Sequence, residues 1–468
     1  MNTKSVIKNI SYSFLANIIS LLLGILATFL FPKFLNVSGY GYYQLYIFYT
    51  GYLIITALGL ADGVQLKIAG QEYRQLNFDE QSSMFWLSSL LQVAVYVVLL
   101  VLSSIMIQDA DKRYAIVCAC IVGLVTHPRY YLYTLLQGVN RLREYSHIII
   151  TERSISIVIS IIALLLGFKD FRLMILFDVI GRILSFVLAM YFCKEIVFRK
   201  PRIDGNIIKK IISYTLSGSM ILFAMQTSSI VIGVNRYGIE HEWGIEEFSK
   251  ISLAIALSNM VLRCVNSISV VMFPTLRNVN TEKLPNIYRN INAILMSTIF
   301  IFMCFFKPVC YLIGIWLPQY ADSLKYSILL LPICIYECKY SLLINTNLKT
   351  LNKEKSIGAI NAVSVIVSFI TTFISIGLLK NMELAIVGIL VSLSIRSMIG
   401  EWIISRIYSI DVIWNIVAEF VLSIAFIFCM YFNNGYSFSV FYLIVVILYT
   451  LIEKKEIISA LKLLKKVY

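Results

Sequence analysis

The apolar stretch RLMILFDVIGRILSFVLAMYFC, residues 172–193, decides the fold class of this chain. A helix needs about 20 predominantly apolar residues to cross a bilayer, and this stretch is long enough. It nevertheless holds Asp178 and Arg182, which lie one helical turn apart. A charge at the centre of a bilayer costs roughly 3 kcal/mol even on mild insertion scales. The stretch therefore predicts a membrane-spanning helix whose charged residues are turned away from lipid.

Comparable apolar runs recur along the whole sequence, which predicts an all-α, polytopic membrane protein. The chain is 59% hydrophobic and only 14% charged, whereas soluble proteins have about 25% charged residues. A β-barrel would instead show segments of about 10 residues with alternating polarity. Run lengths predict about 14 spans. They cover residues 10–31, 40–61, 82–107, 114–137, 146–167, 172–193, 211–233, 248–273, 288–317, 324–347, 357–378, 383–405, 411–432 and 436–452.

The charges between the apolar runs predict the orientation of the chain. Lysine and arginine total 40 against 26 acidic residues, which gives a net charge of +14. Most of the basic residues outside the spans lie on the side of the N-terminus, so the positive-inside rule places both termini in the cytoplasm. The first span, residues 10–31, is too long for a cleavable signal peptide and is expected to stay. Because the basic segments alternate with spans, nucleic acid is not expected as a partner.

Two short sequence echoes predict an internal repeat. KNISYSF at 8–14 enters the first span, and KIISYTL at 210–216 enters the seventh. NRLR at 140–143 and NKEK at 352–355 follow the fourth and tenth spans. Two six-helix halves would have the same orientation, with a pseudo-two-fold axis along the membrane normal. The predicted parts are an N-terminal six-helix lobe (1–200), a C-terminal six-helix lobe (201–405), and two additional helices with a basic cytoplasmic tail (406–468).

No motif of a soluble catalytic domain is present in the sequence. It has no GxxxxGK[S/T] phosphate-binding loop and no HExxH or GxSxG motif. The segments between spans have about 20 residues at most, too few for such a domain. The nine cysteines lie in or beside apolar runs without a ligand pattern, so we interpret them as packing residues. We predict a transporter rather than an enzyme, without a bound metal or cofactor.

Seven basic side chains fall inside the apolar runs. They are Arg129, Arg153, Arg182, Arg263, Lys307, Lys339 and Arg396. Lys307 is expected near the outer surface, and the other six are the candidate substrate-binding residues of a cationic cavity. Arg263 and Arg396, interpreted as unpaired and mid-span, are the strongest candidates to meet an anion, followed by Arg129.

A structural role is the alternative for several of these cations. Asp178 lies one turn from Arg182, Glu337 lies close to Lys339, and Arg153 is near enough to the cytoplasmic end to reach it. Asp178 and Glu337 are also the candidate residues for proton or sodium coupling.

Three motifs resemble those of a known family. LGLADG at 58–63 closes the second span, LLQGVNR at 135–141 leaves the fourth, and GYGYY at 39–43 enters the second. They resemble motifs of the polysaccharide transporter family, which includes the O-antigen flippases. This family belongs to the multidrug/oligosaccharidyl-lipid/polysaccharide exporter superfamily. The resemblance covers the first twelve spans and implies a two-lobe fold similar to that of the multidrug exporters in the superfamily.

The resemblance also implies a flippase function. Such proteins move an undecaprenyl-diphosphate-linked oligosaccharide, such as an O-antigen or capsule repeat unit, from the cytoplasmic to the periplasmic leaflet of the bacterial inner membrane. They work by alternating access, and the diphosphate is the anion that a cationic cavity would suit. The implied partners are the lipid-linked sugar, membrane lipids and the polysaccharide polymerase machinery.

Three alternatives stay open. The additional pair of spans is similar to that of the lipid II flippase of peptidoglycan synthesis. A cation-coupled small-molecule (multidrug) exporter would use Asp178 or Glu337 for ion coupling. A membrane-embedded glycosyltransferase, polymerase or ligase is expected to have a large outside loop, and the longest one here, about residues 234–247, is short.

Overall fold

The computed structural model describes residues 3–202, 204–277, 281–431 and 436–459. Within these residues the chain is helical and contains no strand. Its internal contacts divide it into two compact units, Met1–Gln226 and Thr227–Tyr468, which are called the N-terminal unit and the C-terminal unit below. The predicted division at residues 200 and 405 stays a prediction.

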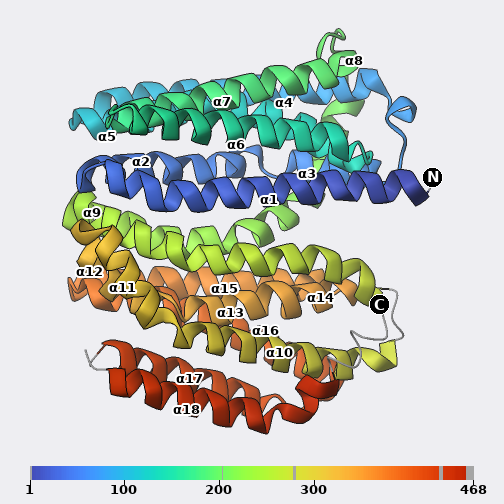
Figure 1. The fold of residues 1–468 in the computed structure, drawn as a ribbon. Coiled ribbons are helices and arrows are strands. Elements are labelled where there is room, and N and C mark those ends of the chain that lie inside the picture. Colours follow the sequence, from blue (N-terminus) through green and yellow to red (C-terminus); the bar gives the residue numbers. More distant parts are fainter. Residues whose placement is uncertain (1–2, 203, 278–280, 432–435, 460–468) are drawn as a thin grey trace. The chain divides into compact units, whose positions relative to one another are not determined.

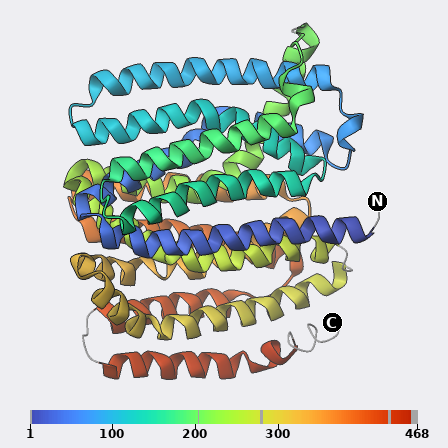
Figure 2. The same ribbon diagram turned by 45° about the horizontal axis from the view of Figure 1, so that its top comes forward.

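The N-terminal unit is a bundle of long helices joined by short turns (Figure 1). Its elements are α1 (Thr3–Phe34), α2 (Val37–Tyr52), η1 (Leu53–Ala57), α3 (Leu60–Ile68), η2 (Tyr73–Gln75), α4 (Phe78–Met106), α5 (Ala110–Gly138), α6 (Leu142–Leu165), α7 (Phe171–Phe192), α8 (Lys194–Val197) and the first part of α9 (Gly205–Arg277). Helix α5 contacts α2, α3, α4, α6 and α7, so it forms the centre of this bundle. Figure 2 shows α4 lying alongside it.

Polar residues at the ends of the apolar runs determine where the helices begin. The side chains of Asn36, Asn77, Asp109 and Asp170 cap α2, α4, α5 and α7. Asp109, for example, accepts a hydrogen bond from the N–H of Asp111 at 2.8 Å. A cap of this kind contributes about 1 kcal/mol because it satisfies N–H groups that have no partner within the helix.

The predicted span 40–61 is not one continuous helix. Its backbone leaves the helical conformation at Leu58 and Gly59, where φ is 53° and 85°, and α3 continues at a bend of 59°. Glycine adopts a positive φ without steric cost, whereas leucine does so rarely. The bend places α3 beyond the predicted end of the span, as far as Ile68.

The glycines of this bend allow a close approach to the start of α9. A Cβ atom on Gly63 would lie 1.9 Å from the carbonyl oxygen of Tyr214, and one on Gly218 would lie 1.9 Å from that of Gly59. Both distances are far below van der Waals contact. The LGLADG motif therefore forms a backbone-to-backbone helix crossing that requires glycine on both sides.

The basic segment after α8 folds onto the start of α4. Arg199 forms an ion pair with Asp79, and this hydrogen bond raises the pKa of Arg199. The carbonyl groups of Arg199 and Val197 accept hydrogen bonds from Ser82 and Trp86 at 2.8 and 2.9 Å. The segment is thus a fixed part of the N-terminal unit.

The C-terminal unit is also a helical bundle, with more breaks in its helices (Figure 1). Its elements are the rest of α9, η3 (Thr281–Lys283), α10 (Leu284–Cys304), α11 (Phe306–Trp316), η4 (Pro318–Tyr320), α12 (Ala321–Leu330), α13 (Ile333–Lys339), η5 (Tyr340–Asn345), α14 (Thr346–Thr350), α15 (Glu354–Thr372), η6 (Phe373–Leu378), α16 (Met382–Tyr408), α17 (Ile413–Tyr431) and α18 (Tyr436–Ile452). The last two helices pack against each other, and both also contact α10.

Helix α9 consists of two arms that meet at Gly244. This residue has φ 81° and ψ −173°, a conformation that is not helical. The arms lie together on both sides of this turn, since Arg236 donates to Ser252 Oγ at 2.7 Å and its guanidinium group lies 4.7 Å from the Phe248 ring centroid. The two arms contain the predicted spans 211–233 and 248–273.

Two further predicted spans are broken. Within the run 288–317, α10 ends at Cys304 and α11 begins at Phe306, next to Lys307. The run 324–347 bends by 46° between α12 and α13, at Pro332. Proline lacks the N–H that a continuous helix needs at this position, which explains the break.

The structure supports a multi-pass membrane protein without fixing the number of passes. In the described part of the chain, 10 helices are long and apolar enough to cross a membrane, or up to 12 if each bent pair is one span. Large apolar side chains on these helices are widely exposed, as Leu90 and Ile105 of α4 are at 67% and 76%. The figure of about 14 spans stays a prediction.

One of the two sequence echoes has the same backbone conformation at both of its positions. Asn140 and Asn352 both have positive φ, 61° and 53°. Their N–H groups bond to the carbonyls of Gln137 and Lys349, each at 3.1 Å. In both cases the next residue opens a turn into the following helix, α6 or α15. The echo of NRLR at 140–143 and NKEK at 352–355 therefore corresponds to the same helix cap in both places.

Candidate functional site

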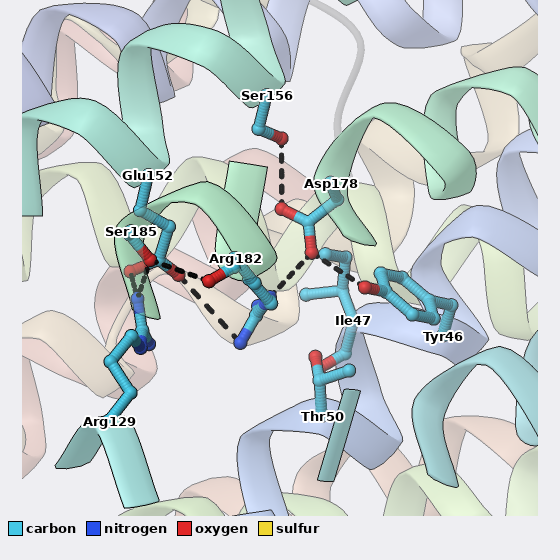
Figure 3. A network of polar contacts seen from close by, with 9 residues as sticks. All are labelled: Tyr46, Ile47, Thr50, Arg129, Glu152, Ser156, Asp178, Arg182 and Ser185. Atoms are coloured by element: carbon cyan, nitrogen blue, oxygen red, sulfur yellow. Dashed lines mark hydrogen bonds and ion pairs between the residues drawn. The ribbon is translucent and has the colours of Figure 1, made fainter. Parts of the chain in front are cut away.

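Four charged side chains of the N-terminal unit meet between α5, α6 and α7 (Figure 3). Arg129 on α5 donates from Nη1 to Glu152 Oε2 on α6, and to Ser185 Oγ at 3.0 Å. Arg182 on α7 donates from Nε to Asp178 Oδ2 at 2.7 Å, and its Nη1 lies 3.7 Å from Glu152 Oε1. One carboxylate, that of Glu152, therefore lies between two guanidinium groups.

Asp178 is held by two hydroxyl groups in addition to Arg182. Tyr46 on α2 donates to Oδ2 at 2.6 Å, and Ser156 on α6 donates to Oδ1 at 2.9 Å (Figure 3). These hydrogen bonds replace the water that the buried carboxylate has lost. The i,i+4 spacing revealed the Asp178–Arg182 pair, but Tyr46 and Ser156 could not be recognised because hydroxyl side chains occur in most spans.

The charges of this network lie deep in their helices. Arg129, Glu152 and Arg182 are each about ten residues from the helix ends at Gly138, Leu142 and Phe192, which corresponds to about 15 Å along a helix axis. The hydrocarbon core of a bilayer is about 30 Å thick. The network therefore lies near the middle of the predicted spans, and its four charged side chains are buried.

A second network surrounds Arg396 in the C-terminal unit. From α16, its guanidinium group donates to Glu337 Oε1 on α13 at 2.9 Å and to Asn361 Oδ1 on α15 at 2.9 Å. Ser228 on α9 accepts a third hydrogen bond at 2.6 Å. The guanidinium carbon also lies 3.6 Å from the ring centroid of Tyr340. The side chain is 2% exposed and is thus fully engaged by the protein.

Lys339 forms a third cluster with two carboxylates. Its Nζ contacts Glu401 Oε2 on α16, and Glu419 Oε1 on α17 at 2.6 Å. We expected Lys339 to lie beside Glu337, and this expectation is wrong. Residues two positions apart in a helix face different sides, so Glu337 is turned toward Arg396 while Lys339 is turned toward α17.

Arg129 and Arg396 differ from the sequence interpretation in a similar way. Neither has a partner in its own helix, but each has a carboxylate partner on a neighbouring helix. The four buried cations Arg129, Arg182, Lys339 and Arg396 are thus all paired. These four residues therefore carry less uncompensated positive charge for binding an anionic substrate than the sequence suggested.

The remaining candidates are placed differently. Arg153 is exposed and Lys307 is half-buried. Arg263 lies within α9, but its side chain is outside the part of the chain that the structure describes. The eight described cysteines form no disulfide with one another. Within the described residues, no group of three potential metal ligands occurs.

Buried charge networks inside a bundle of long apolar helices are typical of a polytopic membrane protein. A family described as polysaccharide biosynthesis protein matches residues 6–280, more than half of the chain. The chain belongs to this family. No curated protein matches the sequence.

Solved structures of transporters have the same fold. A lipid II flippase, MurJ, in an inward closed conformation is similar with a TM-score of 0.64 and 13% identity, over 95% of this chain and 97% of that one. A multidrug resistance MATE family transporter of the MOP superfamily, inward-facing, is similar with a TM-score of 0.62 and 14% identity, over 84% and 98%. The predicted all-α fold of this superfamily is confirmed, and the relatives are transporters, not enzymes.

Proposed function

We propose that the protein is a flippase for an undecaprenyl-diphosphate-linked oligosaccharide, an O-antigen or capsule repeat unit. It acts in the bacterial inner membrane, with both termini in the cytoplasm, and moves its substrate to the periplasmic leaflet by alternating access. The family match supports a role in polysaccharide synthesis. The absence of a catalytic motif from the sequence, together with the transporter fold, supports movement of the sugar rather than its synthesis.

The observation that carries the proposal is the position of Glu152 between Arg129 and Arg182. Two guanidinium groups that converge on one carboxylate form a site of the charge and shape that a diphosphate requires. Arg129 Nε is buried and has no hydrogen-bond partner among the described residues, so one donor remains for a larger anion. The diphosphate of the substrate displaces Glu152 and takes its place between the two arginines.

The C-terminal unit has substrate-binding candidates of its own. Arg396 and Lys339 are the described cations there, and Arg263 is added from its position in the sequence. Displacement of Glu337 from Arg396 by the anion frees a carboxylate that can take up a proton or sodium ion. Asp178 has the same role in the N-terminal unit when the anion draws Arg182 away from it, so substrate binding promotes ion binding.

Replacement of Arg129 or Arg396 by alanine tests the proposal in the bacterium that carries this gene. We expect loss of surface polysaccharide and accumulation of its lipid-linked precursor in variants that reach the membrane in the wild-type amount. Arg74→Ala is the matched control, because this arginine is exposed and lies between the spans. Normal surface polysaccharide in both buried-arginine variants would contradict the role given to these residues.

Two alternative substrates give different phenotypes. If the substrate is lipid II, depletion of the protein causes lysis rather than loss of surface polysaccharide. If it is a small cationic molecule, deletion causes drug sensitivity and leaves surface polysaccharide intact. The solved relatives include a lipid II flippase and a multidrug transporter, so both phenotypes should be scored in the same strain.

A further inference from the structure

The cluster around Lys339 has an excess of negative charge. Its ammonium group contacts the carboxylates of Glu401 and Glu419, and the three side chains are 0%, 1% and 3% exposed. They come from α13, α16 and α17. One positive charge cannot compensate two negative charges, so one carboxylate charge is left over inside the bundle.

No other described cation compensates this charge. Arg396, five residues before Glu401 on α16, is engaged by Glu337, Asn361 and Ser228. An isolated charge in an apolar interior is so costly that the group is neutralised instead. A carboxylate can be neutralised by taking up a proton.

The hydrogen-bonding state of Glu401 agrees with this requirement. Its Oε1 atom is buried and has no partner among the described residues, although Asn415 lies beside the carboxyl group. The hydroxyl groups of Tyr288 on α10 and Tyr449 on α18 lie near both glutamates and also have no partner. The unpaired Oε1 atom of Glu401 can carry an additional proton, and the nearby hydroxyl oxygens can accept a hydrogen bond from it.

Among the described residues, the other ionisable groups near the cluster carry no positive charge. Tyr336 on α13 donates to Ser423 Oγ at 3.1 Å. Glu453, which follows α18, accepts a hydrogen bond from Trp414 Nε1 at 3.1 Å. The ring of Tyr408 packs against the ring of Tyr288. Glu453 thus brings a further acidic group, not a cation, to the side of the cluster near Glu419.

We propose that Lys339, Glu401 and Glu419 form a proton-binding site in which the two glutamates share one proton. This site is distinct from the ion coupling proposed for Asp178 and Glu337. Loss of the proton leaves two negative charges against one ammonium group where α17 meets α13 and α16. Release of the proton therefore loosens the contact of α17 with the rest of the C-terminal unit.

Infrared difference spectroscopy of the purified full-length protein in lipid nanodiscs tests this site. A protonated carboxyl group has its own C=O stretching band, and we expect that band at neutral pH in the wild-type protein. Glu401→Gln and Glu419→Gln should each abolish it, because one remaining carboxylate is balanced by Lys339. Lys339→Gln should roughly double it, because both carboxylates are then neutralised.

Glu354→Gln is the control, since this carboxylate is exposed at the start of α15 and should leave the band unchanged. Retained helical circular dichroism identifies the variants that fold. The proposal is wrong if the wild-type protein lacks the band at neutral pH, or if the band persists in both glutamine variants. The experiment needs no substrate, so its outcome is independent of the flippase proposal.

Discussion

The glycine crossing between the LGLADG motif and α9 gives a quantitative prediction. In Gly63→Ala the new methyl group would lie 1.9 Å from the backbone oxygen of Tyr214, and in Gly218→Ala it would lie 1.9 Å from that of Gly59. Both obstacles are backbone atoms, which cannot move aside as the end of a flexible side chain can. The two helices must therefore separate, and the contacts along the crossing are lost.

The expected cost follows from overpacking. Forcing one additional methyl group into a well-packed site costs about 1–3 kcal/mol, and the upper end applies because both sides are backbone. For a unit of this size, about 3 kcal/mol corresponds to a fall in melting temperature of roughly 6–12 °C. Thermal unfolding of the purified protein in detergent, followed by intrinsic fluorescence, measures this shift.

Gly51→Ala is the matched control for this prediction. Gly51 lies in α2 of the same unit, and a Cβ atom there would have no neighbour within 4 Å. Its replacement should be neutral or stabilising by up to about 1 kcal/mol, since alanine favours the helix. If Gly63→Ala and Gly218→Ala melt at the same temperature as Gly51→Ala, the crossing is not as close as the structure indicates.

Two other changes test the networks and the repeat by the same unfolding measurement. Glu152→Ala should lower the free energy of unfolding by about 3–5 kcal/mol, because it leaves buried guanidinium charge uncompensated. The double variant Arg129→Met/Glu152→Leu should recover most of this loss. Equal stability of the single and double variants would contradict the pairing. Replacement of Asn140 or Asn352 by alanine should in each case cost about 1 kcal/mol of stability, because both residues have positive φ. Glycine at either position should be neutral for the same reason. An unequal response at the two positions would count against a shared cap.

The sequence predicted the fold class, and the NRLR/NKEK echo marked a shared helix cap, because both depend on local patterns. Runs of about 20 apolar residues indicate spans wherever they occur, and the asparagine caps at 140 and 352 are short motifs that act within a few residues. The breaks in the helices were harder to predict. A glycine such as Gly59 or Gly244 is ordinary in a membrane helix, and only the surrounding packing decides whether its φ becomes positive.

The partners of the charges could be predicted only within one helix. Asp178 and Arg182 are four residues apart, so their contact follows from helical geometry. The partners of Arg129 and Lys339 come from helices 23 to 80 positions away along the chain. Such contacts depend on how the helices pack, and one sequence gives no information on that.

The arrangement of α13 and α16 links the proposed proton site to the proposed substrate path. The acid Glu337 on α13 pairs with the base Arg396 on α16, and the base Lys339 on α13 pairs with the acid Glu401 on α16. The same two helices are thus joined by two ion pairs of opposite polarity. A sliding movement that breaks one pair strains the other, because their partners are carried on the same rigid helices. Loss of a proton at Glu401 is therefore expected to change the strength of the Arg396–Glu337 ion pair. Conversely, a substrate anion that draws Arg396 away from Glu337 should change proton binding at Glu401.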